Sequence, residues 1–95
     1  MECASLRFTG HALRRMFERE LDRDGVASVV RGGEVIARYP DDRPFPSQLL
    51  LGFVDSGAVH VVVAQDPASG ACFVVTAYRP DPAVWTPDFK TRRNP

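Results

Sequence analysis

The chain has 95 residues, of which 44% are hydrophobic and 25% are charged, a balance typical of a single globular domain. Its 12 basic and 12 acidic residues cancel to a net charge of zero, which argues against a protein held on nucleic acid by bulk charge alone. No apolar run approaches the roughly 20 residues that cross a bilayer, so no membrane partner is expected. We therefore expect one domain over residues 1–95, with a core at about 5–78 and a C-terminal strap at 79–95.

Two features bear on the cellular compartment. Glu2 stands where a signal peptide would carry positive charge, and no apolar segment follows it, so export by this route is not expected. The only cysteines are Cys3 and Cys72, too few for a disulfide framework. Cys72 lies in an apolar, strand-like run, where a reduced core cysteine is expected. Both features predict a cytoplasmic protein.

The N-terminal third predicts a short strand and two helices. Alternation over residues 5–8 is typical of a strand. Helical spacing of apolar residues follows from Gly10 to about Arg19, with Thr9 as the N-cap, and Asp22 caps a second helix that ends at Gly32-Gly33 in a left-handed conformation. The helix residues expected to be buried are Leu13, Met16, Phe17, Val26, Val29 and Val30.

The rest of the chain predicts β-structure. Four runs rich in β-branched and apolar residues lie at 34–39, 48–54, 59–65 and 72–78. A loop with three prolines separates the first two runs, because proline does not fit inside a sheet, and short turns join the others. The sequence therefore predicts an α+β domain of order β-α-α-β-β-β-β, with both helices on one face of an antiparallel sheet.

Several short motifs, taken in order, carry a resemblance to a known family. They are Thr9-Gly-His11-Ala12-x-x-Arg15-Met16-x-x-Arg19, Pro44-x-Pro46-Ser47-x-Leu-Leu-Leu-Gly52, His60-Val-Val and Thr76-Ala-Tyr78-x-Pro80, followed by Trp85. From about Leu6 to Arg93 the chain resembles the bacterial family catalogued as domain of unknown function 4258. The resemblance implies a RelE/ParE-like toxin fold and a partner antitoxin, for which a zinc-finger protein is one candidate. The family commonly has glycine where this chain has Glu20, so the inter-helix turn is expected to differ here.

The sharpest candidate constellation lies on the first predicted helix. Spacings of three and four residues place His11, Arg15 and Glu18 on one helical face. Cleaving RNA without a metal requires a base for the 2′-hydroxyl, an acid for the leaving oxygen and cations facing the phosphate. We therefore predict His11 as acid or base and Glu18 as its complement, with Arg14, Arg15 and Arg19 as a phosphate clamp. The alternative is a solvated face on which Glu18 pairs with Arg14 or Arg15.

A second set of candidates lies late in the chain. His60 is expected either to be a satisfied buried histidine or to line a cleft with Thr76 and Tyr78, and the turn lengths place it near Thr76. Because RelE-like toxins place a tyrosine or a basic group late in the sheet or tail, the resemblance suggests further candidates for base stacking and phosphate contact. They are Tyr78, Lys90, Arg92 and Arg93. The alternative is edge packing for the tyrosine and a solvated tail. With the arginines of the first helix, this tail is expected to form one contiguous basic surface.

These observations together predict a function. The leading hypothesis is a toxin-like, metal-independent RNA endonuclease, an mRNA interferase of a type II toxin–antitoxin system, which acts on messenger RNA alone or on the ribosome. No metal-ligand spacing and no nucleotide-binding fingerprint occurs in the sequence, so neither a metal nor a cofactor is expected. The alternatives are a non-catalytic RelE/ParE-like module that docks a protein partner and a small metal- or ligand-binding protein.

Overall fold

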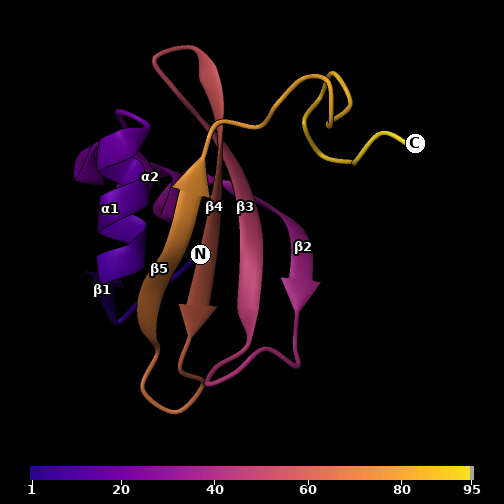
Figure 1. Ribbon diagram of the computed structural model, residues 1–95. Helices are drawn as coiled ribbons and strands as arrows, with labels where there is room; N and C mark the ends of the chain where they lie inside the picture. Colours follow the sequence, from indigo (N-terminus) through magenta and orange to yellow (C-terminus); the bar gives the residue numbers. More distant parts are fainter. Residues whose placement is uncertain (95) are drawn as a thin grey trace.

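The computed structural model describes residues 1–94, which form two helices and one five-stranded sheet (Figure 1). The elements are β1 (Ser5–Phe8), α1 (Gly10–Glu18), α2 (Arg23–Gly32), β2 (Glu34–Tyr39), β3 (Ser47–Val54), β4 (Gly57–Gln65) and β5 (Ala71–Tyr78). The strand order is β1-β5-β4-β3-β2. The predicted α+β class and element order are confirmed. Across residues 1–94, neither helix has the length and apolar character needed to cross a membrane.

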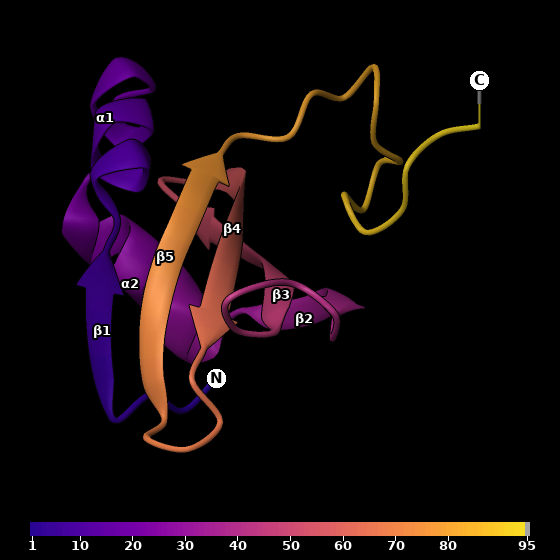
Figure 2. The ribbon, with the colours of Figure 1, turned by 60° about the horizontal axis from the view of Figure 1, so that its bottom comes forward.

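One strand departs from the predicted antiparallel arrangement. β2 to β5 form an antiparallel meander, but β1 pairs with β5 in parallel. The two helices carry the chain from β1 to the far edge of the sheet, and the meander then returns to β1, so that β5 runs beside it in the same direction (Figure 2). The sheet is therefore mixed, and a purely antiparallel sheet was a wrong expectation.

Both helices begin at the predicted side-chain caps. The Thr9 hydroxyl accepts a hydrogen bond from the Ala12 N–H at 3.0 Å, and the Asp22 carboxylate accepts one from the Gly25 N–H at 2.7 Å. Such caps typically contribute about 1 kcal/mol. Between the helices Glu20 has a φ of 57°, so the turn takes the left-handed conformation that glycine favours, at a cost of about 1 kcal/mol. The expected departure of this turn from a glycine-like conformation is not seen.

The end of α2 differs from the prediction. Gly33 is extended, with φ −73° and ψ 163°, and does not take a left-handed conformation. A Cβ atom there would collide with the carbonyl oxygen of Val29 and lie 2.8 Å from that of Leu51. Glycine is therefore needed at this position for the close approach of α2 to β3, and chain reversal is not its role.

The core lies between the helices and one face of the sheet. Its fully or nearly fully buried members are Ala12, Met16, Leu21, Val26, Val29, Val30, Leu50, Val59, Val61, Val63, Cys72, Val74 and Ala77. Two of the six helix residues expected to be buried differ: Leu13 is half-buried, and Phe17 is 86% exposed. Phe17 lies about 100° around the helix from Met16. This angle places the Phe17 ring outside the contact between α1 and β5, where solvent reaches it.

The opposite face of the sheet is covered by two irregular segments (Figure 2). The loop at 40–46 places the Phe45 ring against Phe73, with ring centroids 5.8 Å apart. The segment 79–94, called the C-terminal strap below, packs Trp85 against His60 with ring centroids 4.5 Å apart. Because both faces are covered, the central strands are apolar on both sides.

Cys3 and Cys72 form a disulfide, with their Cα atoms 5.6 Å apart. The parallel pairing sets Ser5 beside Ala71 and so brings the residues before β1 next to the start of β5. The expectation of a reduced Cys72 is therefore wrong, because it depended on a pairing that lies between distant segments. One of the two features behind the cytoplasmic prediction is thereby removed.

Candidate functional site

The candidate residues of α1 share an exposed face, as the helical spacing predicts. Arg15 Nη1 lies 3.1 Å from Glu18 Oε2, and both side chains are about half exposed. His11 and Arg14 are exposed on the same outer surface. A solvent-exposed ion pair of this kind contributes little to stability, and it is the arrangement that the solvated-face alternative describes.

His60 lies on the other side of the sheet and is completely buried. Its Nδ1 atom lies 3.2 Å from the Tyr78 hydroxyl, which is directly opposite on β5, and its Nε2 atom lies 2.8 Å from the Phe89 carbonyl oxygen. The Trp85 ring meets the imidazole edge-on, with an interplanar angle of 87°. Every polar atom of this side chain therefore has a partner within the protein.

These partners determine the tautomer of His60. A carbonyl oxygen can only accept, so Nε2 carries the proton and donates it to Phe89, which leaves Nδ1 to accept from the Tyr78 O–H. Burial lowers the pKa of His60 below its ordinary value of 6.5, and the hydrogen bond to the Phe89 carbonyl opposes this effect. The ring is thus neutral near pH 7, in a chain of hydrogen bonds that runs from the tyrosine hydroxyl to a backbone carbonyl.

The other side of Tyr78 lines a cleft of about 410 Å³ between the end of α1, the end of β5 and the strap. Its lining residues are Arg19, Tyr78, Arg79, Asp81, Val84 and Trp85.

Both arginines in the cleft are anchored through one terminal nitrogen. Arg19 Nη1 donates to the Ala77 carbonyl at 2.9 Å, and Arg79 Nη1 donates to the Val54 carbonyl at 3.3 Å. A Cβ atom at Gly57 would lie 2.5 Å from Arg79 Nη1, so the absence of a side chain there makes room for the second anchor. The remaining N–H groups of both guanidinium groups have no protein partner within residues 1–94 and are available to an anion.

Charge near the tyrosine hydroxyl acts in both directions. Burial raises the pKa of Tyr78 above its ordinary value of 10.0, Tyr39 raises it further, and the positive charges of Arg92 and Arg19 lower it. The hydroxyl therefore keeps its proton at neutral pH, although two guanidinium groups are close enough to act on it.

The sequence profile of the family described as domain of unknown function (DUF4258) matches residues 8–79. The chain belongs to the DUF4258 family. The matched segment includes His60, Tyr78 and both arginines of the cleft, whereas Trp85 and Phe89 follow it. No curated protein matches the chain, and no solved structure matches it.

The basic residues after the DUF4258 segment are divided among different contacts. Lys90 Nζ lies 3.1 Å from Glu34 Oε1 at the start of β2, the Arg92 guanidinium lies over the Trp85 ring at 5.4 Å, and Arg93 Nε donates to the Pro82 carbonyl at 3.0 Å. Of the three, Arg92 is the one that acts on Tyr78. Lys90 and Arg15 are each paired with an acid, so these two members of the expected basic surface are neutralised, whereas Arg19 and Arg92 both act on Tyr78.

Sequence reasoning missed one of the two arginines of the cleft. Arg79 precedes Pro80 and was assigned to the start of the C-terminal strap, although it directly follows the candidate Tyr78 at the end of β5. Proximity to Tyr78 along the chain was the available signal. Its position in the cleft depends on the hydrogen bond to the Val54 carbonyl, and this contact requires the hairpin between β3 and β4.

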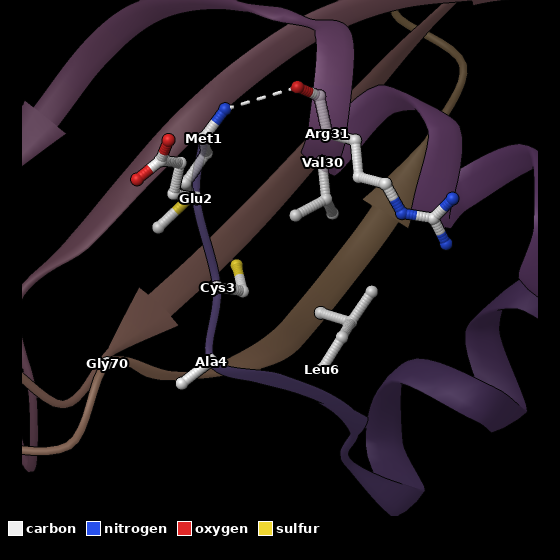
Figure 3. Close-up of a pocket in the computed structure, with 8 residues that line it drawn as sticks. All are labelled: Met1, Glu2, Cys3, Ala4, Leu6, Val30, Arg31 and Gly70. Carbon is white, nitrogen blue, oxygen red and sulfur yellow. Dashed lines mark hydrogen bonds between the residues drawn. The ribbon is translucent and has the colours of Figure 1, made fainter.

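A second hollow in this DUF4258 protein, of about 730 Å³, lies beside the disulfide (Figure 3). In Figure 3 the Glu2 carboxylate and the Arg31 guanidinium point away from each other, and Leu6 and Val30 contribute apolar surface. Polar side chains do not converge there, so we place the candidate site in the cleft at Tyr78. No three His, Cys, Asp or Glu side chains within residues 1–94 gather closely enough to hold a metal ion.

Proposed function

We propose that this protein is a toxin-like, metal-independent RNA endonuclease of RelE/ParE-like type, and that the cleft at Tyr78 is its active site. The observation that supports this is the hydrogen bond of the Tyr78 hydroxyl to a buried neutral histidine, in a cleft whose lining also includes two arginines with free donors. Guanidinium groups bind phosphate oxygens through paired N–H donors. A hydroxyl backed by a neutral imidazole can pass on a proton.

The proposed reaction begins with the RNA 2′-hydroxyl. Arg19 and Arg79 bind the phosphate, and the Tyr78 oxygen takes the 2′-hydroxyl proton while its own proton moves to His60 Nδ1. The 2′-oxygen then bonds to phosphorus, the bond from phosphorus to the 5′-oxygen breaks, and the 5′-oxygen takes a proton from water. The products are a 2′,3′-cyclic phosphate and a 5′-hydroxyl end. The Phe89 carbonyl stabilises the imidazolium, which afterwards returns its proton through Tyr78 to solvent.

This assignment moves the proposed chemistry away from His11. The helix rises about 1.5 Å per residue, which puts His11 roughly 12 Å along the axis from Arg19. His60 takes the place of His11 as the proton acceptor and acts through Tyr78, because its ring has no exposed surface. The proposal also places the protein with messenger RNA in the cytoplasm, either free or on the ribosome, with an antitoxin that covers the cleft.

The experiment is cleavage of a labelled single-stranded RNA by purified protein in the presence of EDTA. We expect 2′,3′-cyclic phosphate ends, and no cleavage at a site where the 2′-hydroxyl is replaced by hydrogen. Tyr78→Phe should lower the rate about 10²–10⁴-fold while retaining RNA binding. Ser28→Ala is the control, because it also removes a hydroxyl but lies exposed on α2 and does not line the cleft, and it should retain the wild-type rate.

Two results would contradict the proposal. A folded Tyr78→Phe variant that cleaves at the wild-type rate would exclude this mechanism. Wild-type protein that binds RNA through Arg19 and Arg79 without cleaving it would exclude the endonuclease function.

A further inference from the structure

An apolar area on α1 belongs neither to the core nor to the cleft. Phe17 is 86% exposed and stands beside a hollow of about 490 Å³ that lies over the end of α1 and the turn to α2. Leu13, Met16 and Leu21 give this hollow an apolar lining. Phe17 itself, Glu20, Asp22 and Arg23 complete the lining. The combination of an exposed aromatic side chain and an adjacent open apolar hollow is typical of a docking surface.

The residues around Phe17 are arranged symmetrically, with opposite charges. Leu13 and Leu21 stand four positions before and after Phe17, and Arg14 and Glu20 stand three positions before and after it. Arg14 lies about 60° around the helix from Phe17, and Glu20 lines the hollow. Both charged side chains are exposed, and neither is in an ion pair within residues 1–94.

This arrangement complements itself. In a contact with two-fold symmetry, every contact occurs twice. If one residue of the first copy contacts a second residue of its partner, that second residue of the first copy also contacts the first residue of the partner. An axis that passes beside Phe17 sets the beginning of α1 in one copy against the turn after α1 in the other. Arg14 then faces the partner's Glu20, and this pair occurs twice.

We propose that this surface is an interface between two copies of the chain. Each Phe17 ring enters the other copy's hollow, and two ion pairs between Arg14 and the partner's Glu20 flank the rings. The second copy is the occupant that the charges favour, because the surface carries one cation and one anion, Arg14 and Glu20, that are both exposed and lack an ion pair within residues 1–94. The interface is small, so we expect a dissociation constant on the order of 10–100 µM. It lies on the helix side of the sheet, apart from the cleft, and does not depend on the proposed function.

The first test measures molecular mass by sedimentation velocity, with protein at concentrations from on the order of 1 µM to 1 mM. We expect wild type to pass from monomer to dimer over this range, and Phe17→Glu to remain a monomer, which corresponds to at least about a tenfold weaker association. Phe53→Glu is the matched control, because Phe53 is also an exposed aromatic, at 63%, and lies in β3 away from the hollow. It should dimerise as wild type does. Circular dichroism of each variant verifies the fold.

The second test uses charge reversal. Arg14→Glu alone and Glu20→Arg alone should each dimerise about three- to tenfold more weakly, because each places like charges together twice. The double variant restores both pairs and should return to the wild-type constant. A mixture of the two single variants should form a heterodimer more tightly than either single variant forms its own dimer.

Any of three results would overturn the proposal: a wild-type monomer at the highest concentration, a dimer that survives Phe17→Glu, or single variants that associate no better when mixed. Binding of a different protein at this surface could not reproduce the preference of the mixed variants for each other. RNA cleavage by Phe17→Glu, measured in parallel, keeps this outcome separate from the fate of the proposed active site.

Discussion

The two faces of the sheet are covered in different ways. On the helix side, apolar residues such as Leu50 and Val61 meet two regular helices, and all the contacts in the core cluster are apolar. On the strap side, the cover is irregular chain, and the buried group at its centre is His60, held by a tyrosine hydroxyl and a backbone carbonyl. The apolar packing on the helix side stabilises the fold but includes no group that can transfer a proton. The strap side holds His60 and Tyr78, which can transfer one. The predictions below separate these two contributions.

The largest effect is expected from a cavity on the helix side. Leu50→Ala removes a fully buried side chain between the sheet and α2 and should lower the free energy of unfolding by about 2–5 kcal/mol. Leu49→Ala, one residue earlier and on the opposite face of the sheet, should cost less, because an irregular segment can settle into the space more readily than a helix. Urea denaturation of both variants measures the difference, and an equal loss would show that the strap is packed as rigidly as the helices.

The next effect concerns the disulfide, which closes a loop across 69 residues. Reduction of the wild type, or Cys3→Ser with Cys72→Ala, should lower the free energy of unfolding by about 2–4 kcal/mol. RNA cleavage by the folded protein should be unchanged, because the bond lies at the opposite end of β5 from Tyr78. If activity falls together with stability in protein that is still folded, the two ends of β5 are coupled. The free energy of unfolding of the double cysteine variant should not change when reductant is added.

The smallest effect is a pH dependence confined to the strap side. Well above pH 6.5 His60 is neutral in both the folded and the unfolded chain. As the pH falls below 6.5, the unfolded chain takes up the proton first, because burial lowers the pKa in the folded protein. The free energy of unfolding should therefore fall between pH 6.5 and 5.5, by at most about 1 kcal/mol.

His60→Gln supplies the control for this pH dependence, since glutamine keeps an N–H donor for the Phe89 carbonyl but has no proton to gain. The wild-type loss should exceed that of the variant over the same interval, as measured by urea denaturation at pH 7.5, 6.5 and 5.5. The other ionisable groups near His60 and its partners are present in both proteins. They are Tyr78, Asp88, Lys90, Arg92, Glu34, Arg19 and Tyr39. Parallel pH profiles for the two proteins would show that His60 does not couple to folding.

Local patterns were sufficient to predict most of the fold. Helical spacing and caps located both helices, and apolar runs between turns located the meander, because these signals depend on neighbours along the chain. The parallel pairing of β1 with β5 has no local signal, and the disulfide was missed with it. Phe17 was misplaced because helical spacing gives the apolar side of α1 but does not show how far a partner extends around it.

The candidate site was predicted less completely than the fold. His60 and Tyr78 were both recognised, but the turn lengths set His60 near Thr76. In the structure His60 instead faces Tyr78, two residues further along β5, and a register shift between Val62 and Val63 accounts for one of these two positions. Arg19 was assigned to a phosphate clamp with Arg14 and Arg15, yet its anchor to Ala77 turns it toward the end of β5. Such register shifts and anchors depend on tertiary contacts, which residue types and spacing do not specify.

The hydrogen bond from His60 to Phe89 has a consequence for how this protein tolerates mutation. The accepting atom belongs to the main chain, so no side-chain substitution at residue 89 can delete it. Phe89 has a φ of 60°, a left-handed conformation that glycine adopts at least as readily as phenylalanine. The tautomer of a buried histidine is thus set by the path of the chain and not by the identity of a residue. Homologous proteins could change every side chain of the strap and still preserve that proton's position, provided that the strap returns to the same place.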